Sequence, residues 1–399
     1  MASSTASPAT LPSTNKAAYI TAAKAHPLQV SNTPNPVTLP SQPNELLIRN
    51  HAVAMNPIDW KMQAWAHIPI AYPAILGNDI AGTVVAVHPD ATHGFRPGDR
   101  VLACPHGFDT KKDEHKGFQE HTVVLAELTA RLPSSMSFEE AVVLPMGIAT
   151  AASGFFNPEL LGLRFPTLLS AGQSSTDGKK EEKQKQEEVL LVSGGASAVG
   201  GNTIQLAAAA GYTVLATASP KNFDAVKKLG ATAVFDYNRY PAAAANETPG
   251  EESNSELVTD ILAAVPAGAV VVGAFDAVGK SGWHIAAEFM ARAVEAGIVA
   301  DRPGAEAGAG KVFVATASPD WSTPTPRNAE LKAMYSLSII RSDIARKVFN
   351  EFLEPALAQG QIKAWPEPLV FGHGLEKVQG ALDLLKDGEV SGQKVVVTL

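Results

Sequence analysis

The sequence predicts an α/β protein in which a doubly wound parallel sheet is joined to a partly open antiparallel β-barrel. Apolar runs, a glycine turn and an Ala-rich segment alternate from Val189 to Asp236, which is the pattern of a βαβαβ unit. Before about residue 137, short apolar runs separated by turns predominate, with little helix between them. A further apolar run within 388–397 indicates that the end of the chain returns to the first domain.

The parallel sheet is expected to begin with Val189–Val192, which a glycine turn connects to a helix. A pyrophosphate that docks on a helix N-terminus needs bare backbone N–H groups and no side chains in its way. The strict G-x-G-x-x-G pattern is absent, but the strand, helix and strand around the turn indicate a Rossmann dinucleotide site. The alternative is a turn whose glycines serve helix and sheet packing only. The candidate phosphate-binding residues are Ser193, Gly194, Gly195, Ala196 and Ser197.

The end of the next strand indicates which dinucleotide is bound. NAD sites of this fold place a carboxylate there for the ribose 2′-OH, whereas NADP sites accommodate the 2′-phosphate with other residues, often basic ones. Here Ala218–Lys221 contains no carboxylate, and the next one along the chain is Asp224. We therefore expect NADPH, with its 2′-phosphate on Ser219 and Lys221. The alternative for Lys221 is an ordinary surface lysine.

The composition excludes several classes of function. The 399 residues suffice for about two domains, and the formal net charge of −8 argues against a nucleic-acid or anionic-membrane surface. The single cysteine, Cys104, excludes a disulfide framework and a zinc site built from several cysteines, and we expect its thiol to be buried and inert. The sequence contains no apolar run of about twenty residues and no secretory signal, so we expect no membrane span and a cytoplasmic location.

Changes in composition along the chain predict its domain organisation. The first domain is expected to be followed by a nucleotide domain and then completed by the C-terminal residues, and two polar, low-complexity stretches are expected to be solvated insertions. The predicted parts are a disordered tail at 1–15, a barrel domain at 16–150 completed by 340–399, and a nucleotide domain at 151–339 with insertions near 171–188 and 241–256.

Two longer helices are predicted outside the nucleotide-binding unit. One begins at Phe138 and continues to Ala152, and Ser137 with Glu140 three residues later forms a capping box before it. The other is Ile344–Ala358, which has helical apolar spacing.

Several short motifs, taken together, resemble those of one known family. They are N-P-I-D-W-K at 56–61, G-N-D-I-A-G-T-V at 77–84, P-G-D-R-V at 97–101, the turn at 193–200 and V-S-G-Q-K-V-V-V at 390–397. The chain resembles the medium-chain dehydrogenase/reductases, and within them the zinc-independent quinone and enoyl reductases. The resemblance covers most of the chain from about residue 40 onwards. It implies that the barrel domain is GroES-like.

Finer details resemble the fungal trans-acting enoyl reductases that serve polyketide synthases. They are D-W-K at 59–61, S-P-K-N-F-D at 219–224, F-D-Y at 235–237 and the ending at 388–394. The resemblance implies an enoyl substrate, small or held on the acyl carrier of a partner synthase, and NADPH as cofactor. The residues that would border NADPH are Asn56, Pro57, Ile58, Asp59, Ser193 to Ser197, Ser219, Pro220, Lys221, Asn222, Tyr237, Val390 and Ser391.

The zinc ligands of the alcohol dehydrogenases in this family have no counterpart in the sequence. Those enzymes use a cysteine and a Gly-His-Glu sequence, whereas here Asn56 occupies the corresponding turn and Gly77, Asn78 and Asp79 replace the tripeptide. Asn and Asp without Cys or His make a poor zinc site. We therefore expect no metal. The ten histidines show no ligand pair on one helix face and are expected at the surface or as capping residues.

Without a metal, conjugate reduction is the chemistry best suited to this scaffold, because it needs a positioned cofactor and stabilisation of negative charge at a carbonyl oxygen. The candidate catalytic donors are Lys61 and Thr150. Lys61 could instead be a surface residue, and Thr150 could simply bond its own helix. The shape of the cleft is expected to depend on the loops Lys61–Tyr72 and Ala317–Met334. The alternative functions are an NADPH:quinone oxidoreductase and a non-catalytic NADPH-binding scaffold.

Overall fold

The structure is a computed structural model of the whole chain. It describes residues 13–34, 37–91, 93–168, 186–239, 255–279, 281–300, 313–318 and 329–399. Most of the predicted tail at 1–15, and nearly all of the predicted insertions at 171–188 and 241–256, lie outside the described residues. The chain divides into two compact units, which consist of 1–145, 367–390 and 394–399 in the first and 146–366 and 391–393 in the second.

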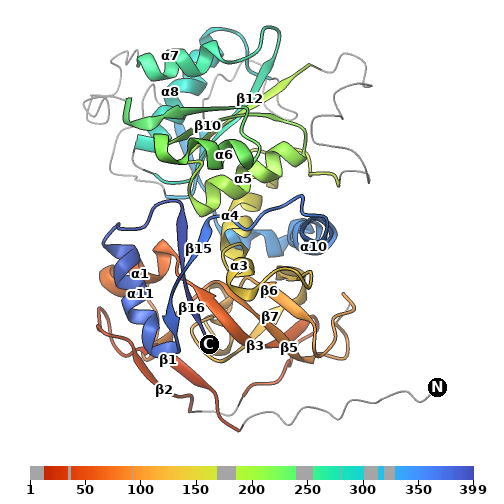
Figure 1. Cartoon of the computed structure of the whole chain (residues 1–399), viewed down its shortest axis with the longest axis vertical. Helices are drawn as coiled ribbons and strands as arrows, with labels where there is room; N and C mark the ends of the chain where they lie inside the picture. The colour runs from red at the N-terminus through yellow and green to blue at the C-terminus, as the bar shows by residue number, and fades with distance from the viewer. Residues whose placement is uncertain are drawn as a thin grey trace, which may run out of the picture. The chain divides into compact units, whose positions relative to one another are not determined.

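The first unit is built around the long strand β3 (Glu45–Ala54) (Figure 1). One edge of β3 pairs with β5 (Ile80–Val87); the other edge pairs with β7 (His121–Leu125) near its start and with β16 (Gln393–Thr398) at its end. These pairs are all antiparallel, and the sheet has the order β15-β16-β3-β5-β6-β8. The remaining strands of the sheet are β6 (Arg100–Ala103), β8 (Thr129–Arg131) and β15 (Glu367–His373).

A small sheet and two packed helices complete the core of this unit. The small sheet has the order β2-β1-β4, with β1 (Lys16–Ile20), β2 (Gln29–Asn32) and β4 (Ala74–Ile75). The two helices are α1 (Pro57–Trp65) and α11 (Val378–Lys386). Their apolar residues share one hydrophobic cluster with alternate side chains of β3. The other helical segments are α2 (Gly107–Thr110), η1 (Asp113–His115), η2 (Ala126–Leu128), α3 (Phe138–Ala141) and η10 (Leu375–Lys377).

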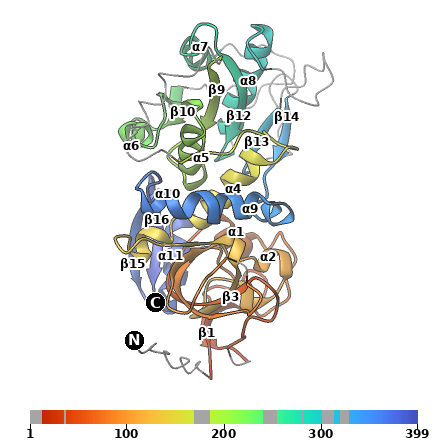
Figure 2. The same cartoon turned by 90° about the vertical axis from the view of Figure 1, so that its right-hand side faces the viewer.

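The second unit contains a parallel sheet in the order β11-β10-β9-β12-β13-β14. Figure 2 labels β9, β10, β12, β13 and β14 of this sheet. In chain order this is 3-2-1-4-5-6, the doubly wound arrangement that the sequence predicts. The direction of winding reverses between β9 and β12, and ligands of such sheets bind beyond the carboxyl ends of the strands at this switch point. The strands are β9 (Glu188–Ser193), β10 (Thr213–Ala218), β11 (Ala233–Asp236), β12 (Val270–Asp276), β13 (Phe313–Thr316) and β14 (Glu330–Ala333).

Helices pack against this sheet: α5 contacts β9 and β10, and α8 contacts β9, β12 and β13. Val189 and Leu191, at alternate positions of β9, join apolar residues of α7 and α8 in one core. The helical segments of the unit are α4 (Pro145–Phe156), of which only Pro145 belongs to the first unit, α5 (Ala198–Ala209), η4 (Pro220–Asn222), α6 (Phe223–Lys228), η5 (Tyr237–Arg239), α7 (Glu256–Ala263), α8 (Ser281–Glu295), η8 (Ser336–Arg341), α9 (Ile344–Arg346), the π-helix η9 (Lys347–Leu353) and α10 (Glu354–Ala358). Within the described residues, no helix is both long enough and apolar enough to cross a bilayer.

The predicted helix from Phe138 to Ala152 is wrong in its continuity. The capping box of Ser137 and Glu140 is present and starts α3, as predicted, but α3 ends at Ala141 and α4 begins at Pro145. Proline lacks the N–H that a continuous helix would require at this position, so it starts a new helix instead. The predicted helix Ile344–Ala358 is present, with a π-helical middle segment, η9.

The predicted domain boundaries differ from the two units at one long segment. Residues 340–366, expected with the barrel domain, belong to the second unit. Their contacts explain the difference: the backbone N–H of Lys363 donates to Gln205 Oε1 at 2.8 Å, and Lys347 lies over the ring of Phe165. A methyl group at Gly201 would lie 2.1 Å from a ring atom of Trp365, so this indole packs directly on α5.

We predict that Gly82→Ala destabilises the first unit, because β5 approaches β3 too closely here to accept a side chain. An added Cβ would lie 2.0 Å from the carbonyl oxygen of Arg49, next to an irregularity in the β3–β5 register. The expected loss is about 2–3 kcal/mol, measured by thermal or denaturant unfolding. Gly372→Ala on β15 is the control, since its Cβ would meet only the flexible side chain of Lys377. Equal losses in the two variants would contradict the prediction.

Candidate active site

A buried polar network joins three segments of the first unit that are far apart in the sequence. Asn56 precedes α1, Asp79 precedes β5, and Lys394 lies on β16. Lys394 Nζ lies 2.5 Å from Asp79 Oδ2 and donates to Asn56 Oδ1 at 3.0 Å, while Asn56 Nδ2 donates to Asp79 Oδ2 at 2.7 Å. None of the three is more than 5% exposed. Each charge is therefore compensated at short range.

Asp59 and Asn78 extend this network. Asp59, in the first turn of α1, accepts from the backbone N–H of Asn56 at 2.8 Å and from Asn78 Nδ2 at 2.7 Å. Burial raises the pKa of Asp59 to about 7, and the negative charge of Asp79 adds to this, while the two hydrogen bonds and Lys394 oppose it. Asp59 thus combines a buried carboxyl group with a pKa near neutrality.

The donor groups of this network do not fit a catalytic zinc ion. By the resemblance of the motifs, Asn56 lies in the turn that carries the zinc-ligand cysteine in the alcohol dehydrogenases, and Asn78 and Asp79 replace the His and Glu of their Gly-His-Glu sequence. Zinc prefers Cys and His, whereas here the donors are two amides and a carboxylate that is already paired with Lys394. An ammonium group thus provides the positive charge beside Asp79.

A cavity of about 1000 Å³ lies in the first unit and reaches Asn78. The loop Lys61–Tyr72, predicted to shape the cleft, contributes five of its lining residues, namely Met62, Ile68, Pro69, Ile70 and Ala71. The loop Ala317–Met334 contributes none, and 319–328 of it lie outside the described residues. The other apolar side chains in the wall include Tyr19, Ile75, Leu76 and Phe108, and the charged ones are Lys111, Asp113, Glu114 and Lys116.

Neither of the two predicted catalytic donors, Lys61 and Thr150, lines this cavity. The ammonium of Lys61 lies 5.8 and 5.5 Å from the ring centroids of Trp60 and Trp65. Thr150, in α4, is buried and its hydroxyl donates to the carbonyl oxygen of Met146 at 2.8 Å. Thr150 thus bonds its own helix, which is the alternative that the sequence left open. A role as donor to a ligand would require this bond to break.

In the second unit, the predicted phosphate-binding turn has the geometry that its glycines allow. Gly194 has φ +78°, and a Cβ on it would lie 2.5 Å from Val278. Ser197 caps α5: its Oγ accepts from the N–H of Gly200 at 3.0 Å and donates to the carbonyl of Gly194 at 2.8 Å. A Cβ on Gly200 would lie 2.2 Å from that same carbonyl oxygen, so the helix begins directly against the turn. These features fit a dinucleotide pyrophosphate on the N-terminus of α5.

Ser219 and Lys221, predicted to bind the 2′-phosphate of the dinucleotide, follow β10. Asn222 Nδ2 donates to Ser219 Oγ at 3.0 Å and lies 3.4 Å from the Oγ of Ser391, a residue 169 positions away in the sequence. The side chain of Lys221 is exposed and forms no ion pair with any residue that the structure describes. Tyr237 follows β11 and is 38% exposed. The remaining predicted residues are Ser193, Gly195, Ala196 and Pro220 in this unit and Pro57, Ile58 and Val390 in the first.

Sequence reasoning missed three residues. Lys394 and Asn78 were part of the motifs but received no role, since their partners are remote in the sequence. Asp276 was read as part of a longer strand, but it ends β12 at the switch point. It accepts from Thr316 Oγ1 at 2.6 Å and from the N–H of Gly279 at 3.0 Å, and burial raises its pKa to about 6. The sequence did contain a signal for Asp276: it is a single carboxylate directly after the apolar run 270–275 and shortly before Gly279.

The histidine and cysteine predictions have different outcomes. His106, His115 and His284 are each 3% exposed and His121 is 8% exposed, so the expectation of surface or capping positions is wrong for these four side chains. Burial lowers the pKa of His106 to about 3 and lowers that of His115 as well. The expectation of a buried Cys104 is confirmed, since the residue is 1% exposed and burial raises the pKa of its thiol far above the ordinary value.

A parallel sheet in this order, with a glycine turn and a capped helix at its switch point, is the arrangement of a Rossmann dinucleotide-binding domain. Residues 42–146 match the model of the alcohol dehydrogenase GroES-like domain. The zinc-binding alcohol dehydrogenase domain-containing protein cipB of Emericella nidulans is 36% identical over 385 residues, which are 96% of this chain and 98% of that protein. The trans-enoyl reductase himH of Aspergillus japonicus is 33% identical over 89% of this chain and 90% of its own length.

A solved structure agrees with the fold. An alcohol dehydrogenase superfamily protein from Novosphingobium aromaticivorans matches with a TM-score of 0.64 and 23% identity, over 96% of this chain and 99% of that one. The chain belongs to the medium-chain dehydrogenase/reductase family, with a GroES-like domain and a Rossmann domain. It is therefore an oxidoreductase of a family that uses a nicotinamide cofactor.

We predict that Asp59→Asn changes how stability depends on pH. Because the folded-state pKa of about 7 lies above the ordinary 3.8, the folded chain binds more protons than the unfolded chain between these values. Its free energy of unfolding therefore falls from about pH 4 to pH 7, and this contribution, roughly 4 kcal/mol at most, disappears in the variant. Denaturant unfolding at several pH values measures it. Asp387→Asn, at an exposed carboxylate of the same unit, is the control. Parallel pH profiles for Asp59→Asn and wild type would refute the assignment.

Proposed function

We propose that the chain is an NADPH-dependent, zinc-independent reductase of an activated carbon–carbon double bond, in an enoyl thioester or an enone. The observation that carries the proposal is the buried pair of Lys394 and Asp79. At the position of the catalytic metal in zinc-dependent relatives, an ammonium pairs with the carboxylate, so the residues suit a reaction that needs no Lewis acid there. Conjugate reduction is such a reaction, because charge develops on a carbonyl oxygen that hydrogen-bond donors can stabilise.

Bound NADPH would supply a hydride to the β-carbon of the unsaturated carbonyl compound, whose oxygen then takes the negative charge until the α-carbon is protonated. Among the chain's own groups, the amide of Asn78 lies in the cavity wall and donates to Asp59. Asp59, with a pKa of about 7, can hold a proton next to this wall at neutral pH. Lys61 and Thr150 remain our proposed donors to substrate or nicotinamide.

The preference for NADPH rests on the segment after β10. Ser219 and Lys221 follow the strand where NAD-specific sites carry an acidic residue, and Lys221 is exposed and available to a phosphate group. The side chain of Asn222 supports Ser219 from one side. A 2′-phosphate would find a cation and a hydroxyl here, with Asp224 as the nearest following carboxylate in the sequence.

The cavity suits an acyl chain. Its volume of about 1000 Å³ is at the upper end of ordinary ligand pockets. Apolar side chains such as Met62, Ile70 and Phe108 form one part of its wall, and the rest is polar, with Asn78, the charged residues at 111–116, and Asn15, Thr21, Gln29, Ser31, Asn32, Thr33, Thr38 and Gln119. The relative himH is named a trans-enoyl reductase. We therefore propose that the natural substrate is an enoyl chain held on the carrier of a separate polyketide synthase.

We predict NADPH oxidation with a crotonyl or longer enoyl thioester, measured at 340 nm against a simple quinone and with NADH as the control cofactor. Lys221→Ala should raise the KM for NADPH roughly 10- to 100-fold, because a charge-assisted hydrogen bond is lost, and should leave that for NADH unchanged. Lys227→Ala, an exposed lysine of α6, is the matched control.

Two outcomes of this assay would overturn the proposal. Turnover of the quinone without turnover of any thioester would assign the chain to the quinone oxidoreductases. Binding of NADPH with no turnover of either, and none after a synthase carrier domain loaded with an enoyl chain is added, would indicate a non-catalytic role.

We predict that Ile70→Trp selects against long chains. Ile70 lines the cavity, and the larger side chain fills part of the volume that an acyl chain would use. The KM for a decenoyl thioester should rise about tenfold, while the KM for crotonyl thioester stays the same. Val370→Trp, at a half-exposed position of β15 outside the cavity wall, is the control for the added indole. Equal changes in the KM of both thioesters would show that the cavity does not bind the acyl chain.

A further inference from the structure

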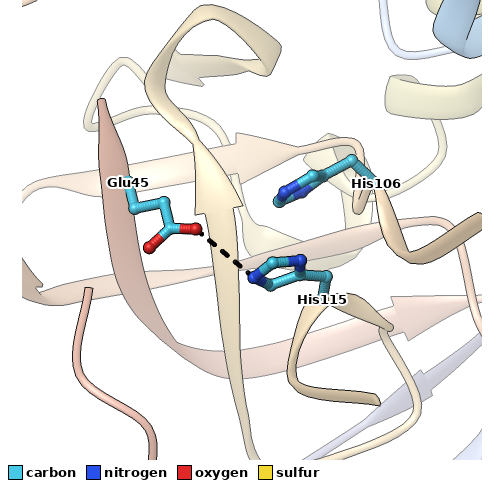
Figure 3. Close-up of side chains that lie close together, drawn as sticks. All are labelled: Glu45, His106 and His115. Atoms are coloured by element: carbon cyan, nitrogen blue, oxygen red, sulfur yellow. Dashed lines mark ion pairs between the residues drawn. The ribbon is translucent and has the colours of Figure 1, made fainter. Parts of the chain in front are cut away.

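Three buried side chains in the first unit converge outside the network described above. Glu45 is the first residue of β3, His106 precedes α2, and His115 ends η1. Each offers a ligand atom, and these atoms lie within 4.8 Å of one another (Figure 3). Glu45 is 2% exposed and each histidine 3%. Among the described residues, this is the group in which three such ligand atoms gather.

Glu45 and His115 are held in place by groups that leave one atom of each facing the other. Glu45 Oε2 accepts from the backbone N–H groups of Ser41 at 2.7 Å and Gln42 at 2.9 Å, and the Nδ1 of His115 lies 2.8 Å from the hydroxyl of Thr110. The facing atoms, Glu45 Oε1 and His115 Nε2, are 3.4 Å apart. This is long for an N–H···O hydrogen bond. It equals the separation of about 3.4 Å between two ligand atoms of a tetrahedral site with bonds of about 2.1 Å.

His106 supplies an independent observation. Its buried Nδ1 has no hydrogen-bond partner among the described residues, although buried polar atoms are nearly always paired. Its ring stacks on that of His115 with centroids 4.1 Å apart and an interplanar angle of 20°. An imidazole nitrogen that is buried and unpaired is either a cost to the fold or a ligand without its ion.

We propose that Glu45, His106 and His115 bind one divalent transition-metal ion of the zinc type. Two imidazole nitrogens and a carboxylate oxygen form a common protein donor set for zinc, and a fourth position is left for a water molecule or another ligand. Two nearly parallel rings cannot both hold one ion in their planes, so His106 turns out of the stack when the ion binds.

The place of this ion in the fold gives it a structural role. Gly107 follows His106, Lys116 follows His115, and both line the cavity. The ion would tie β3 to the segment 106–116 and so fix one wall of the cavity. The sequence led us to expect no metal because the alcohol dehydrogenase ligand positions lack Cys and His, and none of these three residues occupies such a position.

The test uses the full chain after chelator treatment and dialysis. Calorimetric titration with Zn²⁺ should saturate at about one ion per chain, and Co²⁺ should give the visible absorption of a four-coordinate site. Zinc at about 100 times its Kd should raise the melting temperature of the first unit by about 5–10 °C.

Variants assign the ion to these residues. His106→Phe keeps an aromatic ring on His115 and removes the ligand nitrogen, so zinc binding should weaken at least tenfold; Glu45→Gln should have a similar effect. His121→Gln is the matched control, because His121 is a buried histidine of the same unit whose Nδ1 also lacks a partner. Absence of saturable binding to the wild-type chain, stoichiometric binding that persists in His106→Phe, or equal loss in His121→Gln would each overturn the proposal.

Discussion

The buried ion pair of Lys394 and Asp79 is the interaction on which the site of the first unit depends. Taking two charges out of water is offset only by close pairing and additional hydrogen bonds, and both are present, since the ammonium and the carboxylate each also bond Asn56. The pair connects the turn before α1, the start of β5 and the C-terminal strand β16. Loss of either charge would leave the other buried and uncompensated, next to the Asn78 amide that reaches the cavity.

The parallel sheet could be predicted because its signals are local. The strand β9, the glycine turn and the helix α5 follow one another within residues 188–209, and the handedness of crossovers then leaves few possible strand orders. The break at Pro145 had a local signal too, since proline cannot continue a helix, but the continuous helix that we expected from Phe138 to Ala152 ignored it. The pairing of β16 with β3, and with it the position of Lys394, could not be predicted: it joins Val396 to Ala54, and no pattern within a short window specifies it.

The candidate site was predictable to a similar extent. Turn residues such as Ser197 and Ser219 follow strands directly, so strand prediction is enough to place them. Lys61 was singled out for the same reason, yet Met62 beside it lines the cavity. Adjacent residues of a helix point about 100° apart, so choosing between them requires the rotational phase of α1. Asn56 and Asp59 set that phase through the hydrogen bond from the Asn56 N–H, which a strand pattern does not reveal.

The zinc binding and the zinc-independent reduction that we propose are compatible with each other because the two cation positions are separate. At Asp79 the positive charge belongs to the protein itself and is fixed on β16, so an incoming ion would have to displace a buried ammonium. At Glu45 the carboxylate faces an imidazole at 3.4 Å, and the neighbouring His106 has an unpaired nitrogen. An ion would gain ligands at the second position and would meet repulsion at the first. A zinc affinity measured on the whole chain would therefore belong to the site of Glu45, His106 and His115 beside the cavity wall, and not to the position at Asp79.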